Sequence, residues 1–166
     1  MCRPRCRMAD LTSFPKKRRG EMAYEFKLEK TVEFSETDMA GIVHFSNYFR
    51  YMEMAEHAFF RSLGFSIHSR EQEPQIGWPR VQVSCEYKKP LRFEDRIEIH
   101  LLVREKRPRS LAYEVRISRI EEDGGREEVA RGTLTTVCIT FDRERKQMKA
   151  VAIPADIDAQ IEVAPE

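Results

Sequence analysis

One long amphipathic segment stands among short alternating stretches, and this contrast constrains the fold more than any other feature of the chain. From about residue 47 to residue 63, apolar side chains recur at three- and four-residue steps, which predicts an α-helix with one broad apolar stripe. The stripe comprises Tyr48, Tyr51, Met52, Ala55, Phe59 and Leu63. Ser46 is a good N-cap candidate, and Gly64 suits the position that follows the C-cap.

Alternation of apolar and polar residues, typical of half-buried strands, occurs on both sides of this helix. The alternating stretches are residues 25–34, 81–87, 96–104, 111–120 and 129–141. Asp123-Gly124-Gly125 predicts a hairpin turn between the last two, and residues 65–77 are expected to be irregular. The predicted order is therefore one strand, one long helix and four strands in hairpin succession.

A single helix cannot cover both faces of a five-stranded sheet. The expected α+β fold therefore wraps a curved antiparallel sheet around the helix as its core. One sheet face and one edge remain unburied in this arrangement, so we expect a dimer or a tetramer. The chain has 166 residues, enough for one domain, which we place at 22–158 with a short C-terminal tail at 159–166.

Composition argues against several classes of protein. No apolar run approaches the ~18–20 residues of a membrane-spanning helix, and the first twenty residues lack the apolar centre of a secretory signal. The four cysteines are too scattered for a disulfide framework, which favours reduced thiols in a cytoplasm. The motifs of serine hydrolases and nucleotide-binding loops are absent, and the histidines lack metal-ligand spacing. We therefore expect neither a metal nor another cofactor.

The net charge of +1 conceals a basic N-terminal arm. Residues 1–21 contain seven Lys/Arg and two acidic residues, whereas the rest of the chain has a net charge of −4. We interpret the arm as a poorly ordered leader, or as sequence upstream of a start at Met8 or Met22. Contact with nucleic acid or an anionic surface, and an organellar transit peptide, are the alternatives.

The segment between the first strand and the helix holds the best candidate for chemistry. Asp38 lies about eight residues before the predicted N-cap, too far for ordinary side-chain capping, and Gly41 follows it in a small-residue turn. A helix N-terminus presents free N–H groups and a partial positive charge, here near residues 45–48. Acyl transfer from a thioester needs such groups on the carbonyl oxygen and a carboxylate that attacks the carbon or deprotonates water. A purely structural turn carboxylate is the competing interpretation.

Residues 36–48, ETDMAGIVHFSNY, resemble the D-x-x-G-x-V-x-x-x-N-Y signature of hot-dog-fold acyl-CoA thioesterases of the 4-hydroxybenzoyl-CoA thioesterase family. The likeness runs from about Tyr24 to Asp156 and includes Gly77-Trp78-Pro79 and the segment from Met148 to Asp156. It implies hydrolysis of a small aromatic or short aliphatic acyl-CoA by a homodimer or homotetramer. It implies no nucleic-acid or membrane partner.

The resemblance also implies roles for single residues. Asp38 matches the catalytic nucleophile or general base, and Gly41 matches the turn glycine. Phe45 falls where the backbone N–H that polarises the thioester carbonyl is found. His44 is a further catalytic candidate, but it stands one place before the position that histidine usually takes in the family. It can therefore point away from the site.

Substrate-binding roles follow from the same resemblance for Asn47, Tyr48, Trp78, Arg107, Arg109 and Ser110. The first two match the helix-start pair, whose role is more structural than chemical. The basic turn at 107–110 matches the turn that holds the coenzyme A nucleotide, whose phosphates need cations. In the family the site lies between protomers, so this turn can belong to a different chain from Asp38. Trp78 and Phe60 are candidates for the acyl pocket.

Other readings remain open at this point. Glu53 and Glu56 are candidates because a related hot-dog subgroup uses a helix glutamate, but with Asp38 present we expect them to be solvated or interface carboxylates. Lys88 and Lys89 are weaker nucleotide-binding candidates. A non-catalytic module that binds or senses acyl-CoA, and a dehydratase on the same fold, are the competing functions.

Overall fold

The structure, a computed structural model, describes residues 22–67, 75–142 and 147–165. In chain order the elements are β1 (Glu25–Thr31), a 3₁₀ helix η1 (Phe34–Glu36), α1 (Phe45–Ser62), β2 (Ile76–Gly77), β3 (Arg80–Tyr87), β4 (Arg96–Arg107), β5 (Ser110–Ile120), β6 (Arg126–Val137), β7 (Ile139–Asp142), β8 (Gln147–Ala150) and α2 (Ala155–Asp158). The predicted basic arm lies outside the described residues. Within them, no helix has the length and hydropathy needed to cross a membrane.

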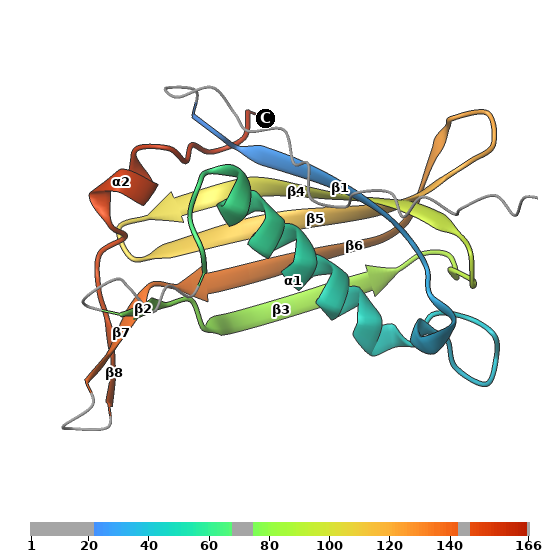
Figure 1. Ribbon diagram of the computed structural model, residues 1–166, viewed down its shortest axis with the longest axis horizontal. Helices are drawn as coiled ribbons and strands as arrows, with labels where there is room; N and C mark the ends of the chain where they lie inside the picture. Colours follow the sequence, from blue (N-terminus) through green and yellow to red (C-terminus); the bar gives the residue numbers. More distant parts are fainter. Residues whose placement is uncertain (1–21, 68–74, 143–146, 166) are drawn as a thin grey trace, which may run out of the picture.

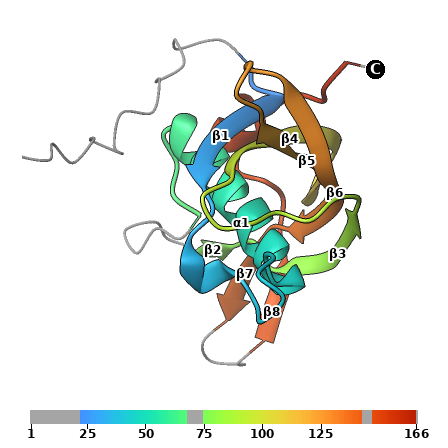
Figure 2. The same cartoon turned by 90° about the vertical axis from the view of Figure 1, so that its right-hand side faces the viewer.

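Five strands form one antiparallel sheet in the order β1-β4-β5-β6-β3, and α1 lies across one of its faces (Figure 1). Viewed end on, the sheet curls around the helix (Figure 2). The inner face of the sheet supplies the core through alternate residues of β4 and β5. These are Ile97, Ile99, Leu101, Val103, Leu111, Tyr113, Val115 and Ile117, all buried. The predicted α+β arrangement of a curved sheet around one helix is confirmed.

The prediction of four strands in hairpin succession is wrong in two places. β4, β5 and β6 do follow one another as hairpins, but β3 pairs with β6 and not with β4. The stretch expected as one strand at 129–141 is divided, because β7 leaves the main sheet to pair with β2 and β8. At the division, the Cys138 N–H donates to the Arg109 carbonyl at 2.8 Å. Side-chain alternation continues through this point, so the pattern alone does not reveal the break.

The predicted apolar stripe of α1 is confirmed, since all six of its residues are buried. The helix also ends as expected, with Gly64 at φ +86° after the C-cap. The Phe65 N–H donates to the Phe60 carbonyl and the Gly64 N–H to the Arg61 carbonyl, both at 3.0 Å. This pair of bonds satisfies carbonyls that the helix end leaves open, and glycine accommodates the left-handed backbone without strain.

The C-terminal segment packs back onto the start of the sheet. Ala23, just before β1, forms an isolated parallel bridge with Ile161, and both side chains are buried. The Ala164 N–H donates to the Val103 carbonyl at 2.8 Å. The residues that we separated as a tail therefore cover part of the β1 side of the molecule.

The helix packs tightly against the sheet at Gly132 of β6. A Cβ atom at this position would lie 2.0 Å from the Met52 Cε and 2.6 Å from the Ser84 carbonyl oxygen. Met52 is fully buried and the Ser84 carbonyl is backbone, so only the methionine has freedom to move. The absence of a side chain at Gly132 thus sets how deeply α1 sits against the sheet.

Gly132→Ala is expected to lower the free energy of unfolding by about 1–3 kcal/mol, the usual range for overpacking a tight core. Gly77→Ala is the matched control, because a Cβ there would meet Ile139 at an ordinary 3.6 Å. Denaturant unfolding of both variants and the parent chain measures the difference. Equal stability of the two variants would contradict the close approach.

Candidate active site

Asp38 lies in a compact turn between η1 and α1. The Asp38 N–H donates to the Ile42 carbonyl and the Gly41 N–H donates to the Asp38 carbonyl, both at 2.9 Å. Gly41 has φ +72°, which glycine adopts without strain. The exposed Asp38 carboxylate accepts a hydrogen bond from the Ala40 N–H to Oδ1 at 2.8 Å. No other described group donates to this carboxylate, so Oδ2 can serve a ligand or a water.

The helix begins with Phe45, and its N-cap is His44 rather than the predicted Ser46. The His44 ring takes the place that serine was expected to fill: its Nδ1 accepts from the Ser46 N–H at 3.4 Å and lies 2.8 Å from the Ser46 hydroxyl. The Asn47 N–H donates to the His44 carbonyl at 2.9 Å. The Phe45 N–H, in contrast, has no acceptor among the described residues. It is the helix N–H that remains available to a ligand.

The helix-start pair, Asn47 and Tyr48, is buried but divides between two tasks. The Asn47 amide donates from Nδ2 to the Glu36 carbonyl at 2.7 Å and so ties α1 to η1. The Tyr48 ring meets the Tyr87 ring edge-on with 5.0 Å between centroids, and burial raises the pKa of Tyr48 to about 12. Its hydroxyl is therefore neutral in ordinary buffers.

An open pocket of about 460 Å³ joins the Asp38 turn to the start of α1. Its lining residues are Asp38, Ile42, Val43, Phe45, Tyr48, Tyr87, Lys88, Lys89 and Pro90. The volume is typical of a small-molecule site, and most of the wall is apolar. The lining residues include those that carry one carboxylate (Asp38), one free helix N–H (Phe45) and two ammonium groups (Lys88 and Lys89). These are the parts that acyl transfer from an anionic thioester needs.

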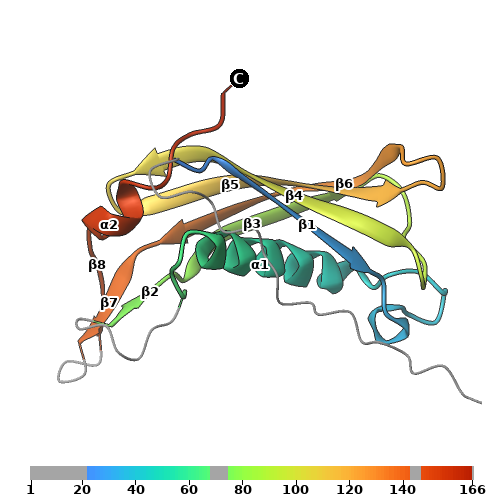
Figure 3. The same ribbon diagram turned by 45° about the horizontal axis from the view of Figure 1, so that its top comes forward.

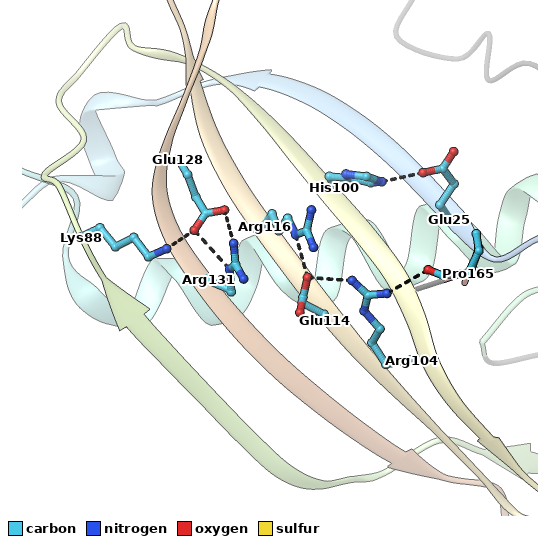
Figure 4. Close-up of polar contacts among 9 residues, drawn as sticks. All are labelled: Glu25, Lys88, His100, Arg104, Glu114, Arg116, Glu128, Arg131 and Pro165. Atoms are coloured by element: carbon cyan, nitrogen blue, oxygen red, sulfur yellow. Dashed lines mark hydrogen bonds and ion pairs between the residues drawn. The ribbon is translucent and has the colours of Figure 1, made fainter. Parts of the chain in front are cut away.

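Lys88 and Lys89 are the cationic residues that line this pocket, although we expected them from the sequence to be weaker candidates for nucleotide binding than the 107–110 turn. Glu128 accepts from Lys88 and, at 2.7 Å, from Arg131 on the outer face of the sheet (Figure 4). Arg131 first, and Lys88 with it, hold the pKa of Glu128 at about 2. Lys89 pairs with Glu127. Surface ion pairs of this kind contribute about 0–1 kcal/mol, so either ammonium can turn to an anionic ligand at little cost.

The basic turn between β4 and β5, which contains Arg107, Arg109 and Ser110, lies at the opposite end of the sheet from the segment between η1 and α1 (Figure 3). β4 starts at Arg96 on the Asp38 side and ends at the basic turn, a span of roughly 36 Å at ~3.3 Å per residue. Within one chain, therefore, the turn does not meet the pocket. Whether these residues bind the nucleotide stays a prediction that involves a second chain.

Trp78 is buried beneath the C-terminal half of α1, with its ring centroid 5.1 Å from that of Phe60. It does not line the Asp38 pocket of its own chain. Among the described residues, no group of His, Cys, Asp and Glu side chains is arranged to hold a metal ion. Cys85 and Cys138 are free thiols.

Comparison with known proteins places this geometry in a family. A family profile described as the thioesterase-like superfamily matches residues 32–161. The chain belongs to this superfamily. The match covers the Asp38 turn, all of α1 and strands β3 to β6 of the main sheet, and it begins just after β1.

Two relatives illustrate how similar the chain is to known proteins. The chain is 27% identical to the 4-hydroxybenzoyl-CoA thioesterase of Pseudomonas sp. (strain CBS-3), over 81% of this chain and 96% of that one. It is 45% identical to a protein of Aquifex aeolicus (strain VF5) named "Putative esterase", over 48% of this chain and 62% of the relative. The chain thus spans less than two thirds of the length of that relative.

The solved structures agree on the fold. A structure of 4-hydroxybenzoyl-CoA thioesterase with an aspartate-to-asparagine substitution, complexed with 4-hydroxybenzoyl-CoA, superimposes with a TM-score of 0.74 at 25% identity. The superposition covers 83% of this chain and 99% of that chain. This thioesterase-like chain therefore has the hot-dog fold that the sequence predicted.

The sequence did not predict the buried pair of Glu56 and Arg80 below α1. Glu56 is fully buried rather than solvated, and its Oε2 accepts from Arg80 at 2.7 Å. Arg80 also pairs with Glu53 at 3.0 Å. A register shift between Arg80 and Gln82 turns the arginine toward the helix. The sequence does contain an indication that Glu56 is buried, because it follows Met52 by four residues and so lies on the apolar stripe.

The buried carboxyl of Glu56 should make stability depend on pH. Burial raises its pKa to about 7 from an ordinary 4.5, although Arg80 opposes this. Between pH 4.5 and 7 the folded chain keeps a proton that the unfolded chain releases, so stability falls as the pH rises through this window. The effect is at most about 3 kcal/mol.

Glu56→Gln is expected to flatten this slope, since glutamine does not titrate. Denaturant unfolding at half-unit steps from pH 4.5 to 8 measures it, with Glu53→Gln as the control on the exposed partner. Parallel curves for the Glu56 variant and the parent chain would show that Glu56 ionises normally in the folded state.

Proposed function

We propose that this chain hydrolyses the thioester of an acyl-CoA whose acyl group is a small aromatic or a short aliphatic one. One observation supports the proposal above all: Asp38, whose Oδ2 has no donor among the described residues, and Phe45, whose N–H has no acceptor there, line the same pocket. The named activity of the Pseudomonas relative, and the 4-hydroxybenzoyl-CoA bound in the superimposed thioesterase structure, support a coenzyme A thioester and favour the aromatic class.

In the proposed reaction the thioester carbonyl oxygen accepts a hydrogen bond from the Phe45 N–H. The positive end of α1 then stabilises the negative charge that grows on this oxygen. Asp38 attacks the carbonyl carbon, or takes a proton from a water that attacks it, and the thiolate of coenzyme A leaves. Hydrolysis needs one water, which delivers its hydroxyl to the acyl group and its proton to the thiol. His44 caps the helix in this scheme and takes no part in the chemical step.

The acyl-CoA site is completed, in this proposal, by a second copy of the chain that pairs along β3. β3 is an edge strand whose apolar residues Val81, Val83 and Tyr87 are 62%, 45% and 47% exposed. A two-fold axis perpendicular to the sheet would pair two such edges antiparallel. The partner's basic turn would then stand at the same end of the joint sheet as Asp38. The assembly would be a cytoplasmic homodimer, or a homotetramer of two such dimers.

Asp38→Asn is expected to lower thiol release from a responsive acyl-CoA by about 10²-fold or more, with little change in folding. A panel of aromatic and aliphatic acyl-CoAs, followed by release of free thiol, measures kcat and KM. Asp10→Asn, in the N-terminal arm, is the control for the same chemical change elsewhere. Acyl-CoA binding without any thiol release by the parent chain would instead indicate a carrier or sensor.

Mixing two inactive variants tests the shared site. If Asp38 and the basic turn come from different chains, each heterodimer of Asp38→Asn with Arg107→Ala/Arg109→Ala holds one intact site. Random reassociation would then restore roughly a quarter of the parental activity, as two-fold symmetry requires. If both parts came from the same chain, mixing would restore nothing. Each variant unmixed, taken through the same unfolding and refolding, is the control.

A further inference from the structure

Lys30 occupies a position where the sheet should present an apolar residue. It follows Phe26 and Leu28 by even steps on β1, so its side chain faces the helix. Its strand partner Ile97 is fully buried, and the Lys30 side chain is only 14% exposed. A charge in such a place is unfavourable unless a partner neutralises it. A lysine here therefore calls for a specific role.

The partner of Lys30 is Glu36, the last residue of η1. The Lys30 Nζ lies 2.5 Å from the Glu36 Oε2 and 4.6 Å from the centroid of the buried Tyr51 ring. Burial acts to raise the pKa of Glu36, but the hydrogen bonds from Lys30 and from the Glu33 backbone outweigh it and hold that pKa below its ordinary value. The pair thus links β1, η1 and α1 at one point.

Glu36 also connects the two groups of the proposed site, the Asp38 carboxylate and the Phe45 N–H. Its carbonyl accepts from the His44 N–H at 2.9 Å and from the Asn47 Nδ2 at 2.7 Å, which fixes the start of α1. Two residues further along the chain is Asp38 itself. The carboxylate of Glu36 accepts from the Glu33 N–H at 2.8 Å, which closes η1. Any movement of Glu36 would shift Asp38 and the Phe45 N–H relative to each other.

We propose that Lys30 and Glu36 are positioning residues, whose ion pair holds the Asp38 carboxylate at a fixed place against the Phe45 N–H. The inference rests on the proposed function, because it assigns those two groups to the reaction. Neither Lys30 nor Glu36 lines the pocket, so neither is expected to touch the substrate. Their effect would appear in the chemical step, where a misplacement of about 1 Å can cost ~10²-fold in rate.

Lys30→Met keeps most of the length of the unbranched side chain and removes the charge. It is expected to lower kcat at least tenfold, with KM within about twofold of the parental value. Lys30→Arg, which preserves the ion pair, should recover most of the loss. Lys27→Met is the matched control on the same strand. Lys27 also pairs with a glutamate, Glu98, but its side chain is exposed and the Nζ–Oε1 distance is 4.0 Å. Unchanged kcat in Lys30→Met, or an equal loss in Lys27→Met, would overturn the proposal.

Amide hydrogen exchange gives a readout that does not depend on catalysis. In Lys30→Met the amides of Asp38, Gly41 and His44 are expected to exchange at least tenfold faster than in the parent chain, while those of β5 stay protected. Unchanged exchange at all three amides would overturn the positioning role even if kcat fell. If Asp38→Asn retained full thiol release, the proposed mechanism would fail, and the exchange rates alone would decide whether the pair orders the turn.

Discussion

The burial of one helix against one sheet determines the rest of this structure. α1 contributes its whole apolar stripe to the inner face, and Gly132 lets the helix approach until Met52 touches the strand backbone. The sheet curls around the body of the helix (Figure 2), and the side chains of the apolar stripe there are committed to the core. The ends of α1 are the parts that remain free to act on a ligand.

The start of α1 is the more reactive end, for reasons that follow from the backbone. It offers unpaired N–H groups and positive potential, whereas the other end is closed by the bonds around Gly64. The His44 cap takes the Ser46 N–H, and the His44 carbonyl takes that of Asn47. Of the N–H groups of Phe45, Ser46 and Asn47, only that of Phe45 has no acceptor among the described residues, and Phe45 lines the pocket. Local capping thus selects which backbone group can stabilise an anion.

The sequence predicted the features that depend on local periodicity. The stripe of α1, its end at Gly64 and the hairpin at Gly124 all follow from spacing and from residues that favour one backbone conformation. The structure bears out these three expectations. The packing of the helix against a curved sheet follows from them.

Features that depend on distant contacts could not be read in the same way. The pairing of β3 with β6 joins segments about fifty residues apart, and the sequence of neither strand indicates its partner. His44 is an uncommon N-cap, so the preference for serine led to the wrong residue. Glu56 and Lys30 break the apolar pattern, and each is explained by a partner elsewhere in the chain, Arg80 or Glu36.

The outer face of the main sheet and its β3 edge are both open in the described part of the chain, and their chemistry differs. The outer face of the sheet carries ion pairs such as those of Glu114 with Arg104 and Arg116 (Figure 4). Burying these charges against a second sheet would require their desolvation, which ion pairing seldom repays. The β3 edge instead offers unpaired backbone groups beside exposed valines, and its last residue, Tyr87, lines the pocket. Association along this edge would therefore act directly on the proposed site, whereas association through the outer face would leave the pocket unchanged.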